Sequence, residues 1–396
     1  MQTLVTGTIY RLLYMAFSFC TGLFISWLAG ASLFGTLSLF TVNAALLILI
    51  SGMGHDASLY WHRSSGKMEA ARSVGYGWLI TAFQLLIFLL ASILSVFLTG
   101  KLLLSRMNAG SFPLEAAYIT GLILTERYST FFYSSGKAAA CNRILSIAAV
   151  STCLLPVISY FLMGNQMSDP VVLFCLIPLL HAIVLIVAFH VDIAYPGMAW
   201  PERTMLKSLF KFSVIVFVTN LIQFFAYRID YWMISYFTEQ KEQIGLYAQA
   251  SRFAQLLWVI PGILAAIVYH ELSSGEEKAA KEKISSLLRT VIFFNFLLLP
   301  FLIVIVRLLL NSFLVEYIDA FRVFLFFLPG MILFCLTILL AAYFSARKDL
   351  RINLFISLLC LILITALDIL LIPGFGIEGA ACAQTIAYGI SGLASL

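Results

Sequence analysis

Twelve apolar runs, spaced about thirty residues apart, dominate this 396-residue sequence. Each run is long enough for the ~20 residues that a helix needs to cross a bilayer. Hydrophobic residues make up 62% of the chain and charged residues only 11%, whereas a soluble domain is about half apolar and a quarter charged. The sequence therefore predicts an all-α integral membrane protein with about twelve transmembrane helices and almost no soluble mass.

The predicted spans leave only short connections between them. Lipid cannot hydrogen-bond the backbone, and the ~10-residue alternation of an outer-membrane barrel is missing, so each span is expected to be a helix. The first run is too long for a signal peptide and is expected to be the first span. In chain order the spans are Leu4–Gly30, Phe34–Tyr60, Gly75–Leu98, Leu114–Ser134, Cys141–Met163, Val171–Val191, Leu209–Phe237, Ile244–His270, Leu287–Leu310, Phe321–Ala346, Leu354–Ile372 and Ile377 to the end.

The basic residues predict the orientation of the chain. Loops after even-numbered spans hold fifteen Lys and Arg, and loops after odd-numbered spans hold five. The positive-inside rule then places both termini in the cytoplasm. This basic face suits anionic membrane lipids, and the chain offers no soluble domain that would carry a nucleic-acid function.

The two halves of the chain resemble each other at an offset of 210 residues. This offset aligns Gly35 with Gly245 and Gly52 with Gly262, among six identities in the second and eighth spans. Since each half has six spans, the halves share an orientation, and their pseudo-two-fold axis would run along the membrane normal. We expect an N-terminal lobe over 1–193, a linker over 194–208 and a C-terminal lobe over 209–396.

Helix-breaking residues lie at matching places in the two halves. Paired interruptions of this kind indicate a substrate path in transporters, although prolines are ordinary in membrane helices. The candidate gating or hinge positions are Gly52, Gly54, Pro261, Gly262, Pro329 and Gly330.

Short motifs occur along the whole chain at Leu28–Gly30 with Phe34–Leu37, Arg228–Asp230, Ile244–Ala248 and Gly376–Ala381. With these motifs the chain resembles the Wzx-type polysaccharide flippases of the multidrug/oligosaccharidyl-lipid/polysaccharide exporter superfamily. The resemblance implies a MATE/flippase-like fold, with two six-helix lobes around a cavity that opens alternately to either side. It also implies an undecaprenyl-pyrophosphate-linked oligosaccharide as substrate, membrane lipids and polysaccharide polymerase or chain-length machinery as partners, and a bacterial cytoplasmic membrane as location.

Four arginines remain within the spans after the other twenty Lys and Arg have been assigned to the loops. A charge inside a span costs at least ~2.5 kcal/mol on insertion scales. Guanidinium groups match phosphate oxygens and stay charged, so arginines in a wet cavity suit a pyrophosphate headgroup. The alternative is pairing with acids inside the membrane, but the sequence neighbours Glu126 and Asp230 point the wrong way for this. Each arginine therefore needs a cavity or a distant partner. The four are Arg11, Arg127, Arg228 and Arg252.

Three acidic residues in the spans are candidates for ion coupling: Asp56, Asp230 and Asp368. A carboxylate in a low-dielectric cavity can carry a proton or bind sodium and so bias a two-state cycle. The alternative is an arginine partner that keeps the acid ionised, which we favour for Asp230, so Asp368 is the better coupling candidate. We expect no metal site and no other cofactor.

Three other functions compete with this hypothesis. A drug exporter of the same superfamily would favour acidic pockets over arginines. An integral-membrane enzyme such as a polymerase would carry a large outer loop or a catalytic acid/His pair, and neither is evident. The peptidoglycan-precursor flippase shares the fold but has two further helices. No Walker motif occurs, and we expect a transporter, not an enzyme.

Overall fold

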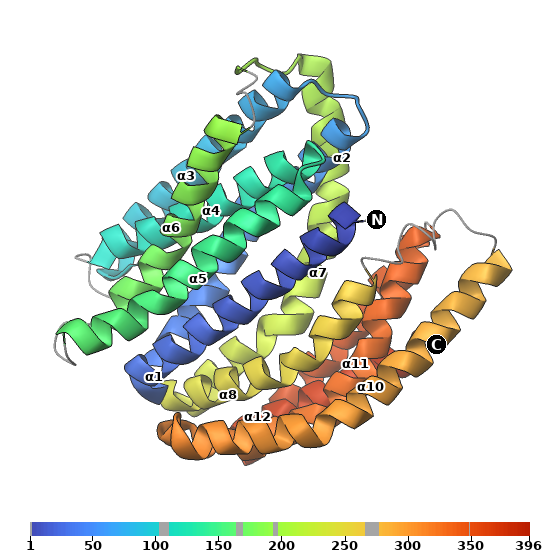
Figure 1. Cartoon of the computed structure of the whole chain (residues 1–396). Helices are drawn as coiled ribbons and strands as arrows, with labels where there is room; N and C mark the ends of the chain where they lie inside the picture. Colours follow the sequence, from blue (N-terminus) through green and yellow to red (C-terminus); the bar gives the residue numbers. More distant parts are fainter. Residues whose placement is uncertain (1, 103–110, 164–168, 193–196, 266–276, 348) are drawn as a thin grey trace. The chain divides into compact units, whose positions relative to one another are not determined.

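The computed structural model describes residues 2–102, 111–163, 169–192, 197–265, 277–347 and 349–396. Within these ranges the regular secondary structure is entirely helical (Figure 1). The predicted all-α architecture is therefore confirmed.

Among the described residues, eight helices are long and apolar enough to cross a membrane, by length and composition. Two of them each contain two predicted spans, because a glycine kink joins the spans without a loop. In α1 (Gln2–Gly52) the kink is at Gly30, with φ 68°, and in α12 (Leu350–Ala394) it is at Gly376, with φ 57°. Glycine adopts this left-handed region at low cost. With α4 (Phe112–Ser134) and α8 (Lys241–Ala254), the set agrees with about twelve spans.

The remaining helices follow the predicted spans. Their bounds are α2 (His55–Ser64), α3 (Ala70–Thr99), α5 (Ala138–Met163), α6 (Pro170–Asp192), α7 (Arg203–Thr238), α10 (Glu277–Ser312) and α11 (Ala320–Ala346), with the 3₁₀ turns η2 (Gln255–Trp258) and η3 (Val315–Tyr317).

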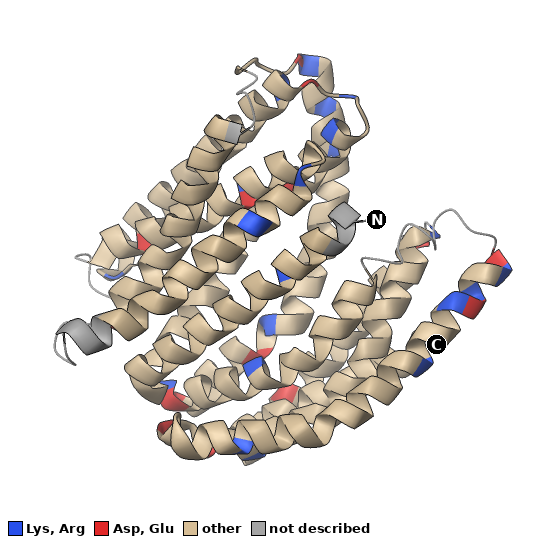
Figure 2. Cartoon of the chain, in the orientation of Figure 1, with Lys and Arg blue, Asp and Glu red and all other residues tan. Residues whose placement is uncertain are grey.

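Large apolar side chains cover the outside of these helices. Phe97, Phe301 and Leu370 are 85%, 63% and 71% exposed. Charged residues gather mainly near helix ends, and most of the helix length carries none (Figure 2). Such surfaces are stable against lipid and would be an aggregation liability in water, which agrees with a membrane-embedded chain.

The chain divides into two compact units. Unit 1 comprises Met1–Ala29 and Phe40–Leu221, and unit 2 comprises Gly30–Leu39 and Ile222–Leu396. In unit 1, α4 packs against α2, α3, α5 and α6; in unit 2, α11 packs against α8, α10 and α12. The limits expected for the lobes and linker stay a prediction about the repeat, and linker residues 194–196 lie outside the described residues.

Within unit 2, the two glycines paired by the internal repeat pack against each other. A Cβ on Gly35 would overlap the Lys241 carbonyl and the Gly245 nitrogen, and a Cβ on Gly245 would overlap the Ala31 carbonyl and the Gly35 nitrogen. The offset from 31 to 241 and from 35 to 245 is 210 in both cases. Contacts that are exchanged between equivalent positions are those expected beside a two-fold axis.

The helix breaks only partly follow the predicted positions. The break in the second span is confirmed, since α1 ends at Gly52, Gly54 has φ 72° and α2 begins at His55. The eighth span is interrupted at η2, just before Pro261, which lies in the helical residues 259–265. Proline cannot donate to the carbonyl four residues earlier, and the Leu257 carbonyl instead accepts from Cys335 Sγ at 3.5 Å.

The other prolines do not break their helices. Pro156, Pro178, Pro300 and Pro329 lie inside continuous helices, so the expected interruption at Pro329-Gly330 is wrong. Neighbouring helices can stabilise the freed backbone groups in a membrane protein. Gly330 instead permits close packing, because a Cβ there would meet Thr385 of α12.

Candidate functional site

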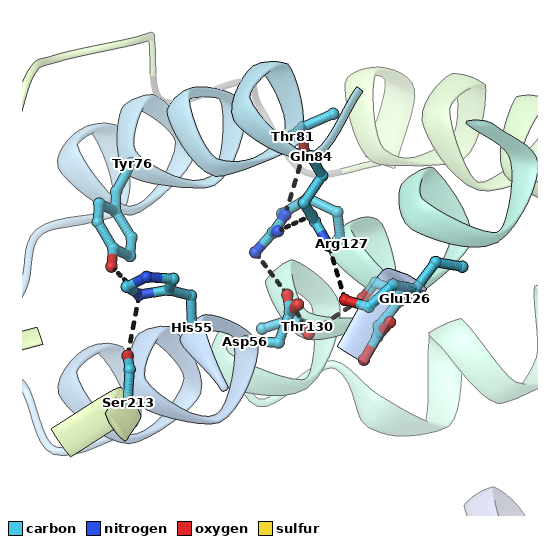
Figure 3. A network of polar contacts seen from close by, with 10 residues as sticks. His55, Asp56, Tyr76, Thr81, Gln84, Glu126, Arg127, Thr130 and Ser213 are labelled. Carbon is cyan, nitrogen blue, oxygen red and sulfur yellow. Dashed lines mark hydrogen bonds and ion pairs between the residues drawn. The ribbon is translucent and has the colours of Figure 1, made fainter. Parts of the chain in front are cut away.

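Arg127 lies at the centre of a buried polar network in unit 1 (Figure 3). Its Nη1 forms an ion pair with Asp56 Oδ1 at 2.5 Å, and its Nη2 donates to Gln84 Oε1 at 3.0 Å. Its Nε donates to Thr81 Oγ1 at 3.2 Å. The arginine side chain is 2% exposed and that of Asp56 is 19% exposed. Each guanidinium nitrogen thus has a protein acceptor, which is the condition for keeping a charge in a low-dielectric interior.

The local fold explains this network. The break at Gly52–Gly54 turns the chain into α2, so that Asp56 faces Arg127 of α4. A Cβ at Gly52 would lie 2.9 Å from Gln84 Nε2, so the glycine leaves room for this amide. The partner of Arg127 is therefore Asp56, 71 residues away, and not its neighbour Glu126.

A second polar cluster on α2 lies beside the first (Figure 3). His55 Nδ1 is 2.5 Å from the Tyr76 hydroxyl and 2.9 Å from the Ser213 hydroxyl. Further along α2, Ser58 donates to the Leu209 carbonyl at 2.9 Å. These contacts fasten α2 to α3 and to the first half of α7.

Unit 2 buries two acidic residues. The Tyr247 hydroxyl donates to Asp230 Oδ2, and the Tyr231 amide donates to Asp230 Oδ1 at 3.0 Å. Asp368 of α12 is fully buried and interacts electrostatically with Asp230. Neither Asp368 carboxylate oxygen has a hydrogen-bond partner among the described residues. A buried carboxyl without donors is unstable as an anion and suits a site that takes up a proton or a cation.

Two of the four candidate arginines lie in unit 2. Arg228 of α7 lies over the Tyr231 ring, 5.7 Å from its centroid, and Arg252 of α8 lies over the Phe34 ring at 5.0 Å. Both guanidinium groups interact electrostatically with Tyr231. Both residues are only partly buried, whereas Arg127 is buried, although Nη1 of Arg252 is itself buried.

The fourth arginine is separate from these groups. Arg11 is exposed on α1 and interacts electrostatically with Tyr133 of α4. The structure thus places Arg11 and Arg127 in unit 1, and Arg228 and Arg252 together in unit 2. Their roles in substrate binding stay predictions.

Sequence reasoning missed the uncharged members of these clusters. Thr81, Gln84 and Tyr247 are neutral residues inside apolar runs, and only their polarity sets them apart. Gln84 and Tyr247 are 2% and 0% exposed. A buried amide in a membrane span needs a partner, and this was the available signal for Gln84. In the described part of the chain, no group of three or more His, Cys, Asp and Glu is placed to hold a metal.

Comparisons with known proteins establish the fold. No family model matches the sequence, and no curated protein matches it. The solved structure of the lipid II flippase MurJ in an inward closed conformation superposes with a TM-score of 0.77 at 19% identity, covering 98% of this chain and 87% of that chain.

Two further solved structures have the same fold. An inward-facing multidrug resistance MATE transporter gives a TM-score of 0.66 at 14% identity, covering 98% of this chain and 96% of that chain. A MOP superfamily transporter from Pyrococcus furiosus gives a TM-score of 0.63 at 13% identity, covering 99% of this chain and 93% of that chain. This chain therefore has the fold of MOP superfamily transporters, and the predicted MATE/flippase-like fold is confirmed.

Proposed function

We propose that this protein flips a polyprenyl-pyrophosphate-linked oligosaccharide from the inner to the outer leaflet of a bacterial cytoplasmic membrane. It would work by alternating access, with both termini in the cytoplasm. In this proposal the protein is a transporter and catalyses no covalent step. The substrate's headgroup is anionic and its tail stays in lipid, so the protein must offer cationic groups within the membrane.

The observation that carries this proposal is the arginine pair of unit 2. Arg228 and Arg252 are partly exposed and both act on Tyr231. A charge facing lipid is costly, so arginines that remain partly exposed in spans are expected to face a wet cavity or an anion. Two guanidinium groups that act on the same tyrosine could together bind the several oxygens of a pyrophosphate.

The fold supports the same substrate class. The structure of MurJ, which is named as a lipid II flippase, superposes with a TM-score of 0.77. The inward-facing multidrug transporter superposes with a TM-score of 0.66. Lipid II and the proposed substrate share a polyprenyl chain, a pyrophosphate and sugars. By this reasoning, lipid-linked glycans are favoured over small cationic drugs.

We also propose that the buried acids of unit 2 couple transport to an ion. Asp230 already has two donors, whereas the two oxygens of fully buried Asp368 lack one among the described residues. Binding of H⁺ or Na⁺ would neutralise this carboxylate and stabilise the arrangement in which it is buried. Release of the ion would favour an arrangement in which Asp368 is hydrated.

The proposal can be tested with an arginine double variant. In R228A/R252A, we expect lipid-linked repeat units to accumulate on the cytoplasmic leaflet and surface glycan to be lost, at normal protein level. The matched control is R307A, since Arg307 also lies over an aromatic ring, Phe321, at 4.9 Å, but is exposed near the end of α10.

The same experiment distinguishes the alternatives. Repeat units that reach the outer leaflet but stay unpolymerised would indicate an enzyme. Normal glycan with raised sensitivity to cationic dyes would indicate a drug exporter. Normal glycan in R228A/R252A would refute the role of the arginine pair.

A further inference from the structure

An aromatic cluster surrounds the helix break of unit 2. Tyr227 of α7, Trp258 of η2, Phe334 of α11 and Tyr388 of α12 pack together, with ring centroids between 4.3 and 6.3 Å apart. Four helical elements each contribute one ring. The cluster therefore holds Trp258 firmly at a place where the eighth span leaves α-helical geometry, and such discontinuities border substrate sites in transporters.

Two rings of this cluster are partly accessible, and one of them, Tyr227, lies on the side of α7 opposite two of its exposed apolar side chains. Phe334 and Tyr388 are buried, whereas Tyr227 and Trp258 are only partly buried. On α7, Tyr227 lies nine residues from Val218 and from Tyr236, which are 46% and 75% exposed. Nine residues are two and a half helical turns, so Tyr227 lies on the opposite side of α7 from these apolar-facing positions.

The cluster also contains hydrogen-bonding groups without partners. The amide of exposed Gln223 donates to the Tyr227 hydroxyl at 2.9 Å, and Gln384 donates to the Tyr388 hydroxyl at 2.9 Å. Trp258 Nε1 and Gln384 Oε1 are buried and have no hydrogen-bond partner in the described ranges. Such groups are rare in folded proteins and require an explanation. One donor and one acceptor beside aromatic rings would suit a ligand with both C–H faces and hydroxyl groups.

We propose that Tyr227 and Trp258 form a stacking platform for the sugar next to the pyrophosphate. This inference rests on the proposed flippase function and deepens it. A pyranose presents a face of C–H bonds that packs on the electron-rich face of an aromatic ring. Its hydroxyl groups can exchange hydrogen bonds with the amide of Gln223, which is exposed beside Tyr227.

The position of the arginines supports this assignment. Arg228 follows Tyr227 directly in α7, and Arg252 precedes Trp258 by six residues. Each arginine thus lies within two helical turns of one ring along its own segment of the chain. In the proposal, the phosphates bind at Arg228 and Arg252 and the first sugar lies against Tyr227 and Trp258. The platform would recognise a sugar ring by shape and would tolerate different hydroxyl patterns.

The test is equilibrium binding to the purified full-length protein. The probes are radiolabelled polyprenyl pyrophosphate without sugar and the same lipid bearing one glucose, galactose or N-acetylglucosamine. For the wild type, we expect at least one sugar-bearing lipid to bind about tenfold more tightly than the sugar-free lipid. W258A and Y227A should lose this increment and keep the affinity for the sugar-free lipid.

Three controls make the result decisive. W258F should keep most of the increment, Y236A should behave as the wild type, and R228A/R252A should weaken both lipids alike. The platform is refuted if the wild type binds the sugar-bearing and sugar-free lipids with the same affinity. It is also refuted if W258A unfolds at the same temperature as the wild type but loses affinity for both lipids equally. A folded wild type that binds neither lipid would instead refute the proposed function, and with it the platform.

Discussion

The contact between Gly35 and Gly245 allows a prediction whose magnitude follows from the structure. In G35A, the added methyl group would overlap the Lys241 carbonyl and the Gly245 nitrogen. Both are backbone atoms, so the clash can be relieved only by moving the helices apart. Overpacking of this kind costs about 1–3 kcal/mol. The helix-propensity gain of about 1 kcal/mol from Gly to Ala is the same in the packed and separated arrangements and cancels between them.

These two helix segments can be packed together, as in the structure, or moved apart. The equilibrium between the two arrangements should therefore shift toward the separated one by a factor of about 5 to 150 in G35A. It can be measured in a cysteine-free background with one cysteine at position 31, because Ala31 is 4% exposed and its carbonyl lies against Gly245. We expect a membrane-impermeant maleimide to label this cysteine faster in G35A by the same factor. G245A should have the same effect, since its methyl group would overlap the Ala31 carbonyl.

A glycine in open space provides the control. In α12, a methyl group added at Gly374 would have nothing within 4 Å of it, so G374A should label at the wild-type rate. If G35A and G245A also label at the wild-type rate, the two backbones do not pack as closely as the structure indicates. The contact of Gly35 and Gly245 would then not be what holds the two helix segments together.

Two further predictions concern the buried charges. D56A should lower the free energy of unfolding by about 3–5 kcal/mol, because it leaves Arg127 buried without its partner. Thermal unfolding in detergent measures this loss. The control is E202A, which breaks the exposed ion pair of Arg72 and should lower the free energy of unfolding by under about 1 kcal/mol. A D56A variant as stable as E202A would contradict the importance of the pair. D368N should keep wild-type stability while transport loses its response to a Na⁺ or H⁺ gradient in vesicles, and an unchanged gradient response would exclude Asp368 from coupling.

Much of the fold follows from the spacing of apolar runs, because each run must form a spanning helix. The same spacing cannot show whether a loop separates two spans. Gly30 and Gly376 take positive φ values and join consecutive spans into α1 and α12 without a loop. The sequence also placed the interruption of the eighth span at Pro261. The distorted turn instead precedes the proline, because the missing hydrogen bond belongs to the turn before it.

The site was less predictable, because partners in a membrane protein are distant in sequence. Charged residues inside spans are few, so the sequence alone was enough to select Arg127, Asp230 and Asp368 as candidate site residues. In the structure, each of them lies near other polar or charged groups. However, helical geometry only excluded Glu126 as the partner of Arg127. Choosing Asp56 required knowing that the break at Gly52–Gly54 starts a new helix facing α4. Aromatic residues are so common in this chain that nothing in the sequence singled out Trp258.

Arg127 of unit 1 and the two arginines of unit 2 have different surroundings, and this difference predicts different roles. Unit 1 buries Arg127 with a nearby acid and two neutral acceptors, so an anion could bind there only by displacing a strong internal partner. In unit 2, Arg228 and Arg252 stay partly exposed and are held over aromatic rings. An aromatic face orients a guanidinium group, which stays charged. Unit 2 is therefore the better candidate to take the headgroup, while the Arg127 network stabilises unit 1.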